Sequence, residues 1–421
     1  MFTVVESIPQ NLTYPSGAPS HVSTYTGLST LLKNAQSTIE IASFYWTLQN
    51  TDVPPLPADP SSWEGQSLFD MLYKAGKFRK IKIRIAQNKP TDLYPQIDTE
   101  ILASQAGAEV RSLDFDKLVG AGILHTKMWL IDRKHFYVGS TNLDWRSLTQ
   151  VKELGGVVQN CSCMAEDMGK IFDVYWYLGA SSKVPADWPA SYSTQINSTH
   201  PAEITYNGQP ASTYLSSSPA SFCPKGRTVD IDAIIQVIRE AQEFVFVAVM
   251  DYLPVIVNYS GKPSKFWPII DDELRRAAFD RQVQVRVLGS LWNHTDPSML
   301  KFLTSLSEIS RTGQGSIEVK MFKVPTYTEA QARIPFARVN HNKYMVTERS
   351  AYIGTSNWSG DYFVSTGGIG LIVTQPKPEE EGVTNLPVRQ QVEDIFRRDW
   401  DSRYSQPVED LNPVGYEVNG L

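Results

Sequence analysis

Apolar residues recur along the chain at two different spacings. Short continuous runs rich in valine, isoleucine and aromatic residues occur at 38–46 and 283–288, and such runs predict buried β-strands. Stretches with apolar residues three or four positions apart precede them, at 27–36 and 266–280, and predict amphipathic helices. Strands that alternate with helices indicate an α/β fold in which helices cover both faces of a sheet.

The same succession of apolar runs occurs twice. Four runs in the first half match four runs in the second half in the same order, each offset by roughly 200 to 225 residues. The matched pairs are 38–46 with 243–252, 81–86 with 283–288, 107–113 with 315–322, and 171–176 with 395–400. A period this long indicates duplication of a whole domain rather than a solenoid repeat. We therefore predict two homologous domains, at 1–195 and 196–421.

Polar and proline-rich stretches interrupt the apolar runs. The stretch 178–204 is rich in serine, proline and alanine, and we expect it to connect the two halves. We expect insertion loops at 51–66 and at 374–387, the second of which is acidic and exposed.

One polar pattern also occurs in both halves. Residues 124–145 read LHTKMWLIDRKHFYVGSTNLDW, and residues 340–360 read NHNKYMVTERSAYIGTSNWSG. Each copy has a histidine, a lysine two positions later, an acid five positions after the lysine, and then a Gly-[Ser/Thr]-x-Asn turn. Chance rarely repeats a pattern of so many positions. The pattern therefore predicts six catalytic residues: His125, Lys127, Asp132, His341, Lys343 and Glu348.

The paired motifs suit the hydrolysis of a phosphodiester. Side chains at positions i and i+2 of a strand share a face, so each strand presents an imidazole and an ammonium group together. Two such halves, related by a pseudo-twofold axis, would form one pocket in which the lysines, Asn142 and Asn357 bind the phosphate oxygens. One histidine can attack phosphorus to give a phosphohistidine, while the other protonates the leaving oxygen and then activates water.

The motifs make no demand for a metal or another cofactor, because the lysines supply the positive charge. The usual pKa of histidine, about 6.5, makes both roles feasible at mildly acidic pH. The two motifs are nearly equivalent, so their spacing leaves open which histidine is the nucleophile.

Further side chains near the motifs are candidates for binding the substrate. Aromatic rings among them either stack on a base or, in the case of the two tryptophans, pack in the core. The candidates are Asn142, Asn357, Ser140 and Thr355 in the turns, Trp145 and Trp358 just after them, and Phe44, Tyr45, Tyr252 and Leu253 at the ends of matched runs.

Composition narrows the class of partner and the compartment. The chain has 421 residues, 42% of them hydrophobic, which is enough for a large core or two domains. Its net charge of −6 argues against a basic coat for duplex nucleic acid but allows a local basic pocket. No apolar run of about 18 residues occurs, and the first residues do not read as a signal peptide. The protein is therefore either cytosolic or lacks a targeting segment that was removed.

Glycosylation sequons favour a luminal or secreted protein. They occur at Asn11, Asn160, Asn197, Asn258, Asn293 and Asn357. We expect Asn357 to be unmodified because it lies inside the second motif. The three cysteines, Cys161, Cys163 and Cys223, form neither a complete disulfide framework nor a zinc-binding spacing.

The pattern His-x-Lys-x4-Asp-x6-Gly-Ser-x-Asn resembles the motif of the phospholipase D superfamily. Both motifs, together with the segments IASFYWTL, AVMDYLP, FWPIIDDELRRA and FRRDWDSRYS, are similar to one branch, which contains phospholipase D family members three and four and a poxviral relative. The likeness covers nearly the whole chain. It implies two homologous α/β sandwich halves, packed as a pseudo-twofold dimer around one active site.

The resemblance also implies an activity and a location. This branch contains lysosomal 5′→3′ exonucleases that act on single-stranded DNA and RNA with a free 5′ end. Its members are type II membrane proteins that pass through the ER and Golgi, and their luminal part is released by proteolysis; this chain is similar to that part. The resemblance further implies a homodimer, with His125 as the nucleophile and His341 as the general acid.

Two features depart from the superfamily. Glu348 stands where the superfamily has aspartate, as in this branch, and leaves a carboxylate that is expected to orient a histidine. The cysteines that pair in relatives with the equivalents of Cys161, Cys163 and Cys223 are absent from this sequence, so those disulfides are not carried over.

Two other functions stay open on the sequence. A lysosomal phospholipid phosphodiesterase or transphosphatidylase, with phospholipid as substrate, would use the same chemistry and have an exposed apolar rim. An exonuclease would instead have a blind polar pocket with a stacking aromatic ring. A weakly active nucleic-acid-binding protein is disfavoured, because both histidines and both lysines are present.

Overall fold

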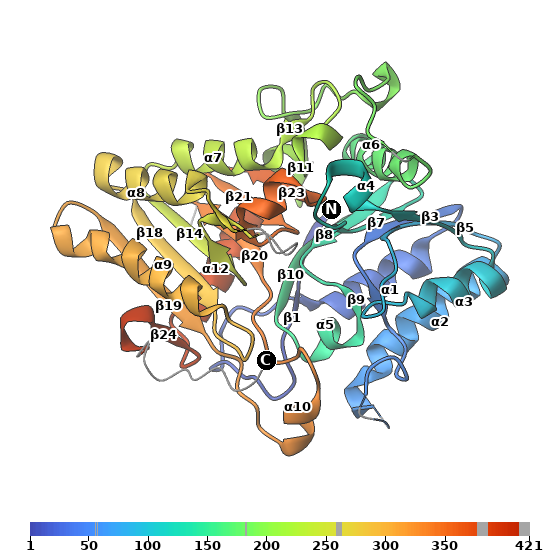
Figure 1. Cartoon of the computed structure of the whole chain (residues 1–421), viewed down its shortest axis with the longest axis horizontal. Coiled ribbons are helices and arrows are strands. Elements are labelled where there is room, and N and C mark those ends of the chain that lie inside the picture. Colours follow the sequence, from blue (N-terminus) through green and yellow to red (C-terminus); the bar gives the residue numbers. More distant parts are fainter. Residues whose placement is uncertain (55, 57, 182, 258–262, 377–385, 412–421) are drawn as a thin grey trace.

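Two mixed β-sheets lie side by side, one in each half of the chain (Figure 1). The structure is a computed structural model and describes residues 1–54, 56, 58–181, 183–257, 263–376 and 386–411.

The first sheet has the strand order β2-β1-β10-β8-β7-β3-β5-β6. Parallel pairing joins β3, β5 and β6, while β1, β10, β8, β7 and β3 pair antiparallel in that order. The strands are β1 (Phe2–Ser7), β2 (Val22–Ser23), β3 (Thr38–Ser43), β5 (Lys82–Asn88), β6 (Glu109–Leu113), β7 (Lys127–Ile131), β8 (His135–Gly139) and β10 (Glu153–Val158).

The second sheet repeats the first strand for strand. Its order is β11-β12-β23-β21-β20-β14-β18-β19-β24, with β13 paired to β12. Along this spatial order, the seven strands from β12 to β19 correspond one for one to the seven strands from β1 to β6 in the first sheet. This correspondence confirms the predicted duplication of an α/β half. The strands are β11 (Ala202–Tyr206), β12 (Gln209–Ser218), β13 (Thr228–Val229), β14 (Phe244–Val249), β18 (Gln284–Ser290), β19 (Ser316–Phe322), β20 (Lys343–Thr347), β21 (Ser350–Gly354), β23 (Gly368–Thr374) and β24 (Ser405–Pro407).

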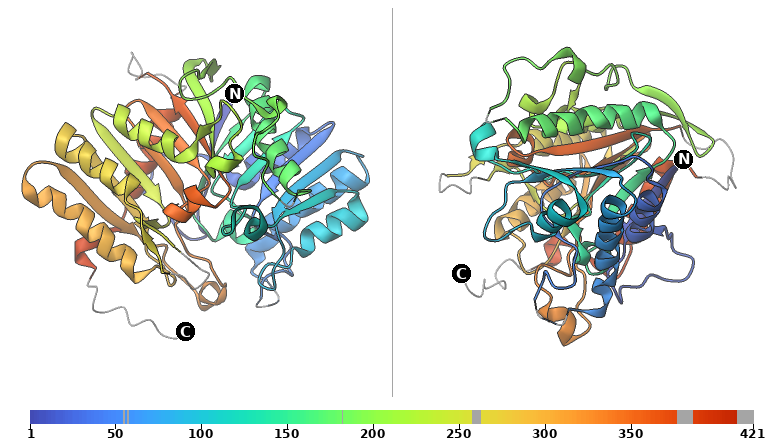
Figure 2. Two further views of the ribbon diagram at one scale, coloured as in Figure 1. Left: turned by 45° about the horizontal axis from the view of Figure 1, so that its top comes forward. Right: turned by 90° about the vertical axis from the view of Figure 1, so that its right-hand side faces the viewer.

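Amphipathic helices cover the outer face of each sheet (Figure 2). Strands covered on both faces are apolar throughout, as in the sequence FVFVAV of β14, in which every residue is buried. The outer helices are α1 (Thr24–Asn34), α2 (Trp63–Lys77) and α3 (Ile97–Ala106) in the first half, and α7 (Asp230–Glu240), α8 (Ile269–Arg281) and α9 (Pro297–Ser307) in the second.

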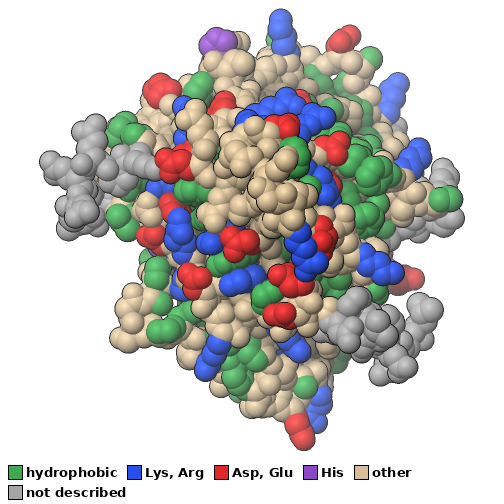
Figure 3. All heavy atoms as spheres, turned by 90° about the vertical axis from the view of Figure 1, so that its left-hand side faces the viewer, with side chains coloured by type: hydrophobic (Ala, Val, Ile, Leu, Met, Phe, Trp, Pro, Cys, Tyr) green, Lys and Arg blue, Asp and Glu red, His purple; other side chains and the backbone are tan. Residues whose placement is uncertain are grey.

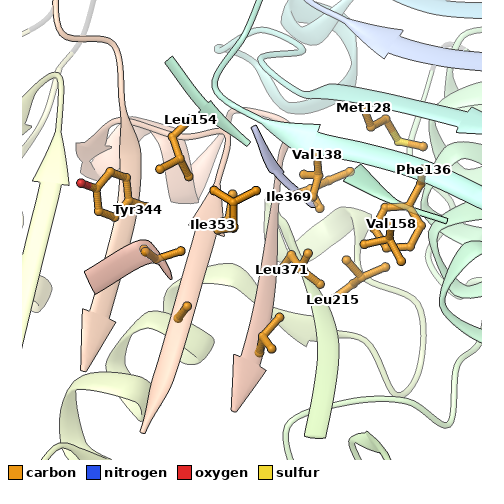
Figure 4. Packing of buried hydrophobic residues seen from close by; sticks show 14 of the residues in the cluster. Met128, Phe136, Val138, Leu154, Val158, Leu215, Tyr344, Ile353, Ile369 and Leu371 are labelled. Carbon is orange, nitrogen blue, oxygen red and sulfur yellow. The ribbon is translucent and has the colours of Figure 1, made fainter. Parts of the chain in front are cut away.

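One large hydrophobic cluster extends across both halves. Helices α6 (Ser162–Leu178) and α12 (Val388–Trp400) pack on the inner faces, and each also contacts the opposite sheet, α6 at β12 and α12 at β1. Side chains from both sheets meet in one cluster, in which Phe136 and Val138 of the first half lie near Ile369 and Leu371 of the second (Figure 4). The halves therefore share a hydrophobic interior that fixes their relative position.

Short elements connect these layers. They are β4 (Trp46–Thr47), β9 (Leu143–Asp144), β15 (Tyr252–Leu253), β16 (Val255–Ile256), β17 (Lys265–Phe266), β22 (Trp358–Ser359), α4 (Phe115–Val119), α5 (Trp145–Thr149), α10 (Glu329–Arg333), α11 (Gly360–Val364), and the 3-10 turns Pro60–Ser62, Ala190–Tyr192, Ala220–Phe222, Glu308–Thr312 and Val408–Asp410.

Element types agree with the sequence patterns, but some boundaries differ. The helices predicted at 27–36 and 266–280 are α1 and α8. The loop predicted at 51–66 is wrong at its end, because Asp59 caps a turn at Ser61 and α2 already begins at Trp63. Most of the acidic loop predicted at 374–387 lies outside the described residues, at 377–385.

The surface carries both signs of charge. On the face shown in Figure 3, basic and acidic side chains are interspersed, in keeping with the small negative net charge. In the part of the chain that the structure describes, no helix is long and apolar enough to cross a bilayer.

Candidate active site

Backbone from the opposite half holds each motif histidine. The N–H of His125, just before β7, donates to the carbonyl of Gly367 just before β23 (2.9 Å). The N–H of His341, just before β20, donates to the carbonyl of Lys152 just before β10 (2.8 Å). These reciprocal pairings bring both histidines into the wall of one cavity of about 460 Å³, lined by residues of both halves.

His125 is held as a neutral imidazole. Its Nδ1 lies 2.9 Å from the carbonyl oxygen of Thr355. A carbonyl can only accept a hydrogen bond, so Nδ1 carries the proton and Nε2 keeps its lone pair. Burial, followed by the positive charges of Lys127 and Lys343, lowers the pKa of His125 well below its usual value. This arrangement leaves a nucleophilic nitrogen.

His341 has a carboxyl partner instead. Its Nδ1 lies 2.8 and 3.0 Å from the two carboxyl oxygens of Glu153, the first residue of β10. Burial raises the pKa of Glu153 to about 8 and lowers the pKa of His341, so burial favours the neutral form of both groups. A phosphodiester adds negative charge, which favours protonation of His341, and the carboxylate of Glu153 would stabilise that imidazolium.

The two halves differ at the position of Glu153. Gly139 pairs with Gly155 across β8 and β10, and Gly354 pairs with Gly370 across β21 and β23, so the equivalent of Glu153 is Gly368. A Cβ atom at Gly368 would lie 2.3 Å from the Ser356 hydroxyl, so a side chain there would force Ser356 to move. The pseudo-twofold symmetry is therefore broken at the histidines, and the carboxyl partner of His341 has no counterpart beside His125.

The two motif lysines are buried beside their histidines. Lys127 Nζ donates to the carbonyl of His125 (2.6 Å), and Lys343 Nζ donates to the carbonyl of His341 (2.9 Å). Burial lowers the pKa of Lys127 well below its usual value and lowers that of Lys343 to about 8. Two ammonium groups that are buried close together repel each other, and a bound anion would reduce this repulsion.

The motif asparagines line the cavity. Asn357 Nδ2 donates to Asp251 Oδ2 (2.8 Å) and to the Tyr362 hydroxyl (3.2 Å). Asn142 Nδ2 lies 3.4 Å from the Tyr45 hydroxyl. Both Oδ1 atoms are buried without a hydrogen-bond partner among the described residues. The ring of Tyr362 also packs edge-on against His125, with 5.0 Å between ring centroids.

Ser140 and Thr355 support the site rather than face the substrate. The hydroxyl of Ser140 bonds to the backbone of Leu154, and the hydroxyl of Thr355 accepts from the Ile369 N–H (2.9 Å). Both side chains are fully buried and lie outside the cavity lining. The prediction that these side chains contact substrate is therefore corrected. They position the site instead, and the backbone carbonyl of Thr355 accepts the hydrogen bond from His125 Nδ1.

The motif acids lie at the far ends of their strands. Asp132 accepts hydrogen bonds from the backbone of Gln36, Ser37 and Thr38, at 2.7–2.8 Å. Glu348 accepts in the same way from the backbone of residues 242–244, at 2.9–3.3 Å. Both carboxylates therefore cap the turn before a strand. The prediction that Glu348 orients a histidine is wrong, because Glu153 has that position.

Four other predicted contacts are corrected. Trp145 and Trp358 are buried in the core, which is the alternative that the sequence left open. Tyr252 and Leu253 are buried in the second half, and the Tyr252 hydroxyl donates to Asp271 (2.8 Å) instead of facing the cavity. Phe44 and Tyr45, by contrast, do line it.

Sequence reasoning missed several cavity residues. Two of them could have been recognised from the sequence. Glu153 follows Lys152 just before an apolar run, and Asp251 is an acid just after a buried strand. Tyr94 and Tyr362 also line the cavity, at positions that no spacing relates to the motifs.

The remaining candidates lie away from the cavity. Among the described residues, no group of three histidine, cysteine or acidic side chains is arranged to hold a metal ion. The sulfur atoms of Cys161 and Cys163 are 3.9 Å apart and not bonded to each other. Of the sequons, Asn11, Asn160 and Asn293 are exposed, Asn197 is half-buried, Asn357 is buried, and Asn258 lies outside the described residues.

Known proteins match most of the chain. The family model described as "PLD3/4, PLD-like domain" matches residues 15–327. The chain is 51% identical over 408 residues to the 5'-3' exonuclease PLD3 of Bos taurus, which covers 96% of this chain and 80% of the relative. It is 50% identical over 408 residues to the human protein of the same name, with the same coverage. It is 42% identical over 409 residues to the mouse 5'-3' exonuclease PLD4, covering 96% and 79%.

Solved structures share the fold at low sequence identity. A phosphatidylserine synthase of Haemophilus influenzae Rd KW20 aligns with a TM-score of 0.57 at 11% identity, over 92% of this chain and 86% of that one. A polyphosphate kinase of Porphyromonas gingivalis aligns with a TM-score of 0.53 at 11% identity, over 96% and 48%. These two likenesses concern the fold alone, whereas the family match and the relatives decide membership: the chain belongs to the PLD3/4 family of phospholipase D-like proteins.

Proposed function

We propose that the protein is a metal-independent phosphodiesterase that degrades single-stranded DNA and RNA from the 5′ end. The observation that carries this proposal is the pair of histidines in one cavity with unlike partners, a carbonyl for His125 and a carboxyl for His341. The names of the relatives, 5'-3' exonucleases, supply the substrate class and the direction of degradation.

The unlike partners support a division of the two chemical roles between the histidines. His125 Nε2 attacks phosphorus, and the bond from phosphorus to the leaving nucleotide oxygen breaks as His341 gives that oxygen a proton. His341 then takes a proton from water, the hydroxide attacks phosphorus, and the phosphorus–nitrogen bond to His125 breaks. Lys127 and Lys343 stabilise the charge on the phosphate oxygens in both steps.

A two-step reaction has a stereochemical consequence that can be measured. Each in-line displacement inverts phosphorus, so a phosphodiester that is chiral at phosphorus should be hydrolysed with overall retention. Inversion would mean direct attack by water and would remove the role of His125 as nucleophile.

Contacts across the cavity support an exonuclease rather than an enzyme that cuts within a strand. Arg146 of α5 donates to the carbonyl of Pro335 in the second half (2.6 Å). Val53, Trp145 and Ile334 form a small apolar cluster in the same region, again from both halves. These contacts join the two halves beside the cavity, and we infer that they favour the entry of a free end over the passage of a continuous strand.

The decisive experiment uses single-stranded oligonucleotides labelled at one end, at pH about 5 with EDTA. Stepwise shortening from a free 5′-hydroxyl end is the expected result. An unchanged oligonucleotide under these conditions would refute the proposal.

A phospholipid is the second candidate substrate, and one observation favours it. Leu93 and Phe336 line the cavity and are 69% and 53% exposed, so part of the rim is apolar. Turnover of phosphatidylglycerol vesicles, with no digestion of oligonucleotides, would assign the same chemistry to lipid.

We further propose that the protein resides in the lysosome lumen and acts as a homodimer. The exposed sequons Asn11, Asn160 and Asn293 support passage through the ER and Golgi. A mobility shift on glycosidase treatment, together with co-fractionation with lysosomes, tests the location. Sedimentation of the purified protein at the mass of one chain would refute the dimer.

A further inference from the structure

The second half contributes an aromatic wall to the cavity. Phe336 stacks on His294, with 4.9 Å between ring centroids and 21° between ring planes, and His294 packs edge-on against Trp292 at 4.7 Å. Trp292 and Phe336 line the cavity, as does His341, five residues after Phe336. This aromatic wall, residues 292, 294 and 336, therefore lies in the half that supplies the proposed general acid.

The first half has its own rings, which are already packed against one another. Tyr94 lies 4.7 Å from Tyr45 and 4.9 Å from Phe44, and all three are half-buried. Phe336 differs because 53% of its surface is exposed although it lines a cavity. An apolar ring with this much surface in contact with water gains free energy when a ligand covers it.

The backbone of Phe336 is held in an unfavourable conformation. Its φ angle is +53°, in the left-handed region that bulky side chains rarely adopt. Contacts on both sides fix this conformation: Arg146 donates to the carbonyl of Pro335 (2.6 Å), and the N–H of Arg338 donates to the carbonyl of Gln150 (3.1 Å). Strained residues that the surroundings hold in place are typical of ligand-binding positions.

A polar group accompanies the rings. The indole N–H of Trp292 is buried and has no hydrogen-bond partner among the described residues. A buried donor without a partner is costly, and a ligand oxygen at the cavity wall would satisfy it. Flat rings beside a single N–H donor match a nucleoside, which has a flat base and a sugar rich in oxygen, better than they match a flexible acyl chain.

We propose that Phe336 stacks on the base of the nucleotide whose oxygen receives the proton from His341. This inference rests on the proposed exonuclease function. The scissile phosphate then lies between two groups of aromatic rings. Phe44, Tyr45 and Tyr94 lie on the side of His125, and the aromatic wall lies on the side of His341. Phe336 acts on specificity, because it selects single-stranded substrates whose bases are free to stack.

The test compares Phe336→Ala and Phe336→Trp with the wild type. Phe336→Ala should lower kcat/KM for a single-stranded oligonucleotide by about 5- to 150-fold, the range for the loss of one stacked base, while Phe336→Trp keeps most of the activity. Methyl p-nitrophenyl phosphate, which has no base, should be hydrolysed equally by all three. Phe266→Ala is the matched control, because Phe266 is 70% exposed and lies outside the cavity.

Abasic oligonucleotides locate the contact. One of the first two nucleotides from the 5′ end supplies the leaving oxygen. An abasic site at that nucleotide should reduce the wild-type rate to that of Phe336→Ala and abolish the difference between the two proteins. The stacking role is overturned if the difference persists with both abasic substrates, or if Phe336→Ala slows only phosphatidylglycerol turnover. A wild-type protein that leaves oligonucleotides intact would refute the proposed function itself, whereas equal digestion by wild type and Phe336→Ala would refute only the stacking role.

Discussion

Replacing Glu153 by glutamine tests how the cavity divides the work between its two histidines. The substitution keeps the size of the side chain but removes the carboxylate that lies 2.8 Å from His341 Nδ1. Glu153 can ionise beside a protonated His341, whereas glutamine cannot, so the imidazolium of the variant would lose its negatively charged partner when it has to hold and deliver a proton. His125 should be unaffected directly, because its Nδ1 bonds to the carbonyl of Thr355 (2.9 Å).

The size of the effect follows from that one contact. Hydrogen bonds to charged groups contribute about 1.5–3 kcal/mol. Each 1.4 kcal/mol of transition-state stabilisation corresponds to about tenfold in rate, so kcat/KM on oligonucleotides should fall about 10- to 150-fold. A good leaving group needs no proton, so the initial burst of p-nitrophenol from a nucleoside p-nitrophenyl phosphodiester should change far less than oligonucleotide cleavage.

Glu348→Gln serves as the matched control. Glu348 belongs to the second motif, but its carboxylate bonds to backbone N–H groups at residues 242–244. Its replacement should leave kcat of the folded protein unchanged. The reasoning is refuted if Glu153→Gln cleaves oligonucleotides at the wild-type rate, or if it slows the p-nitrophenol burst by the same factor as oligonucleotide cleavage.

Four further outcomes are expected. His125→Ala and His341→Ala should each abolish oligonucleotide turnover, and only His341→Ala should retain a p-nitrophenol burst; substantial hydrolysis by either variant would overturn the two-histidine mechanism. Asp132→Ala should lower the free energy of unfolding by about 1–3 kcal/mol in denaturant titrations without changing kcat of the folded protein, because Asp132 caps the turn before β3. Burial raises the pKa of Glu153 from 4.5 to about 8, so the folded protein binds more protons than the unfolded chain in that window. Stability should therefore rise as pH falls from 8 towards 4.5, and Glu153→Gln should flatten Tm against pH.

Most of the fold prediction came from the repeat of apolar runs in the sequence. Matched apolar runs such as 38–46 and 243–252 correspond to β3 and β14, which occupy equivalent places in the two sheets. Helix boundaries were harder, since the start of α2 depends on a cap at Asp59 that lies in a stretch rich in proline and serine. Local composition there favoured a loop, and burial of the face of α2 that includes Leu68 outweighed it.

The two histidines and two asparagines that the motif spacing predicted line the cavity, whereas the motif acids lie away from it. The period of two along a strand relates each histidine to the lysine two positions later, and this is a local property. Asp132 and Glu348 lie beyond the ends of their strands, where their carboxylates meet the turn that leads into the neighbouring strand. The spacing of residues within one motif gives no information about that neighbouring strand.

The amino-acid sequence by itself determined the α/β class, the duplication and the identity of both nucleophile candidates, because hydrophobic period and motif spacing are properties of neighbouring residues. Only the tertiary structure decided how the two histidines differ. Glu153 reaches His341 from a strand of the opposite half, and Gly368 occupies the equivalent position beside His125. That difference arises from the packing of two sheets across a pseudo-twofold axis, which joins residues about 190 positions apart in the chain.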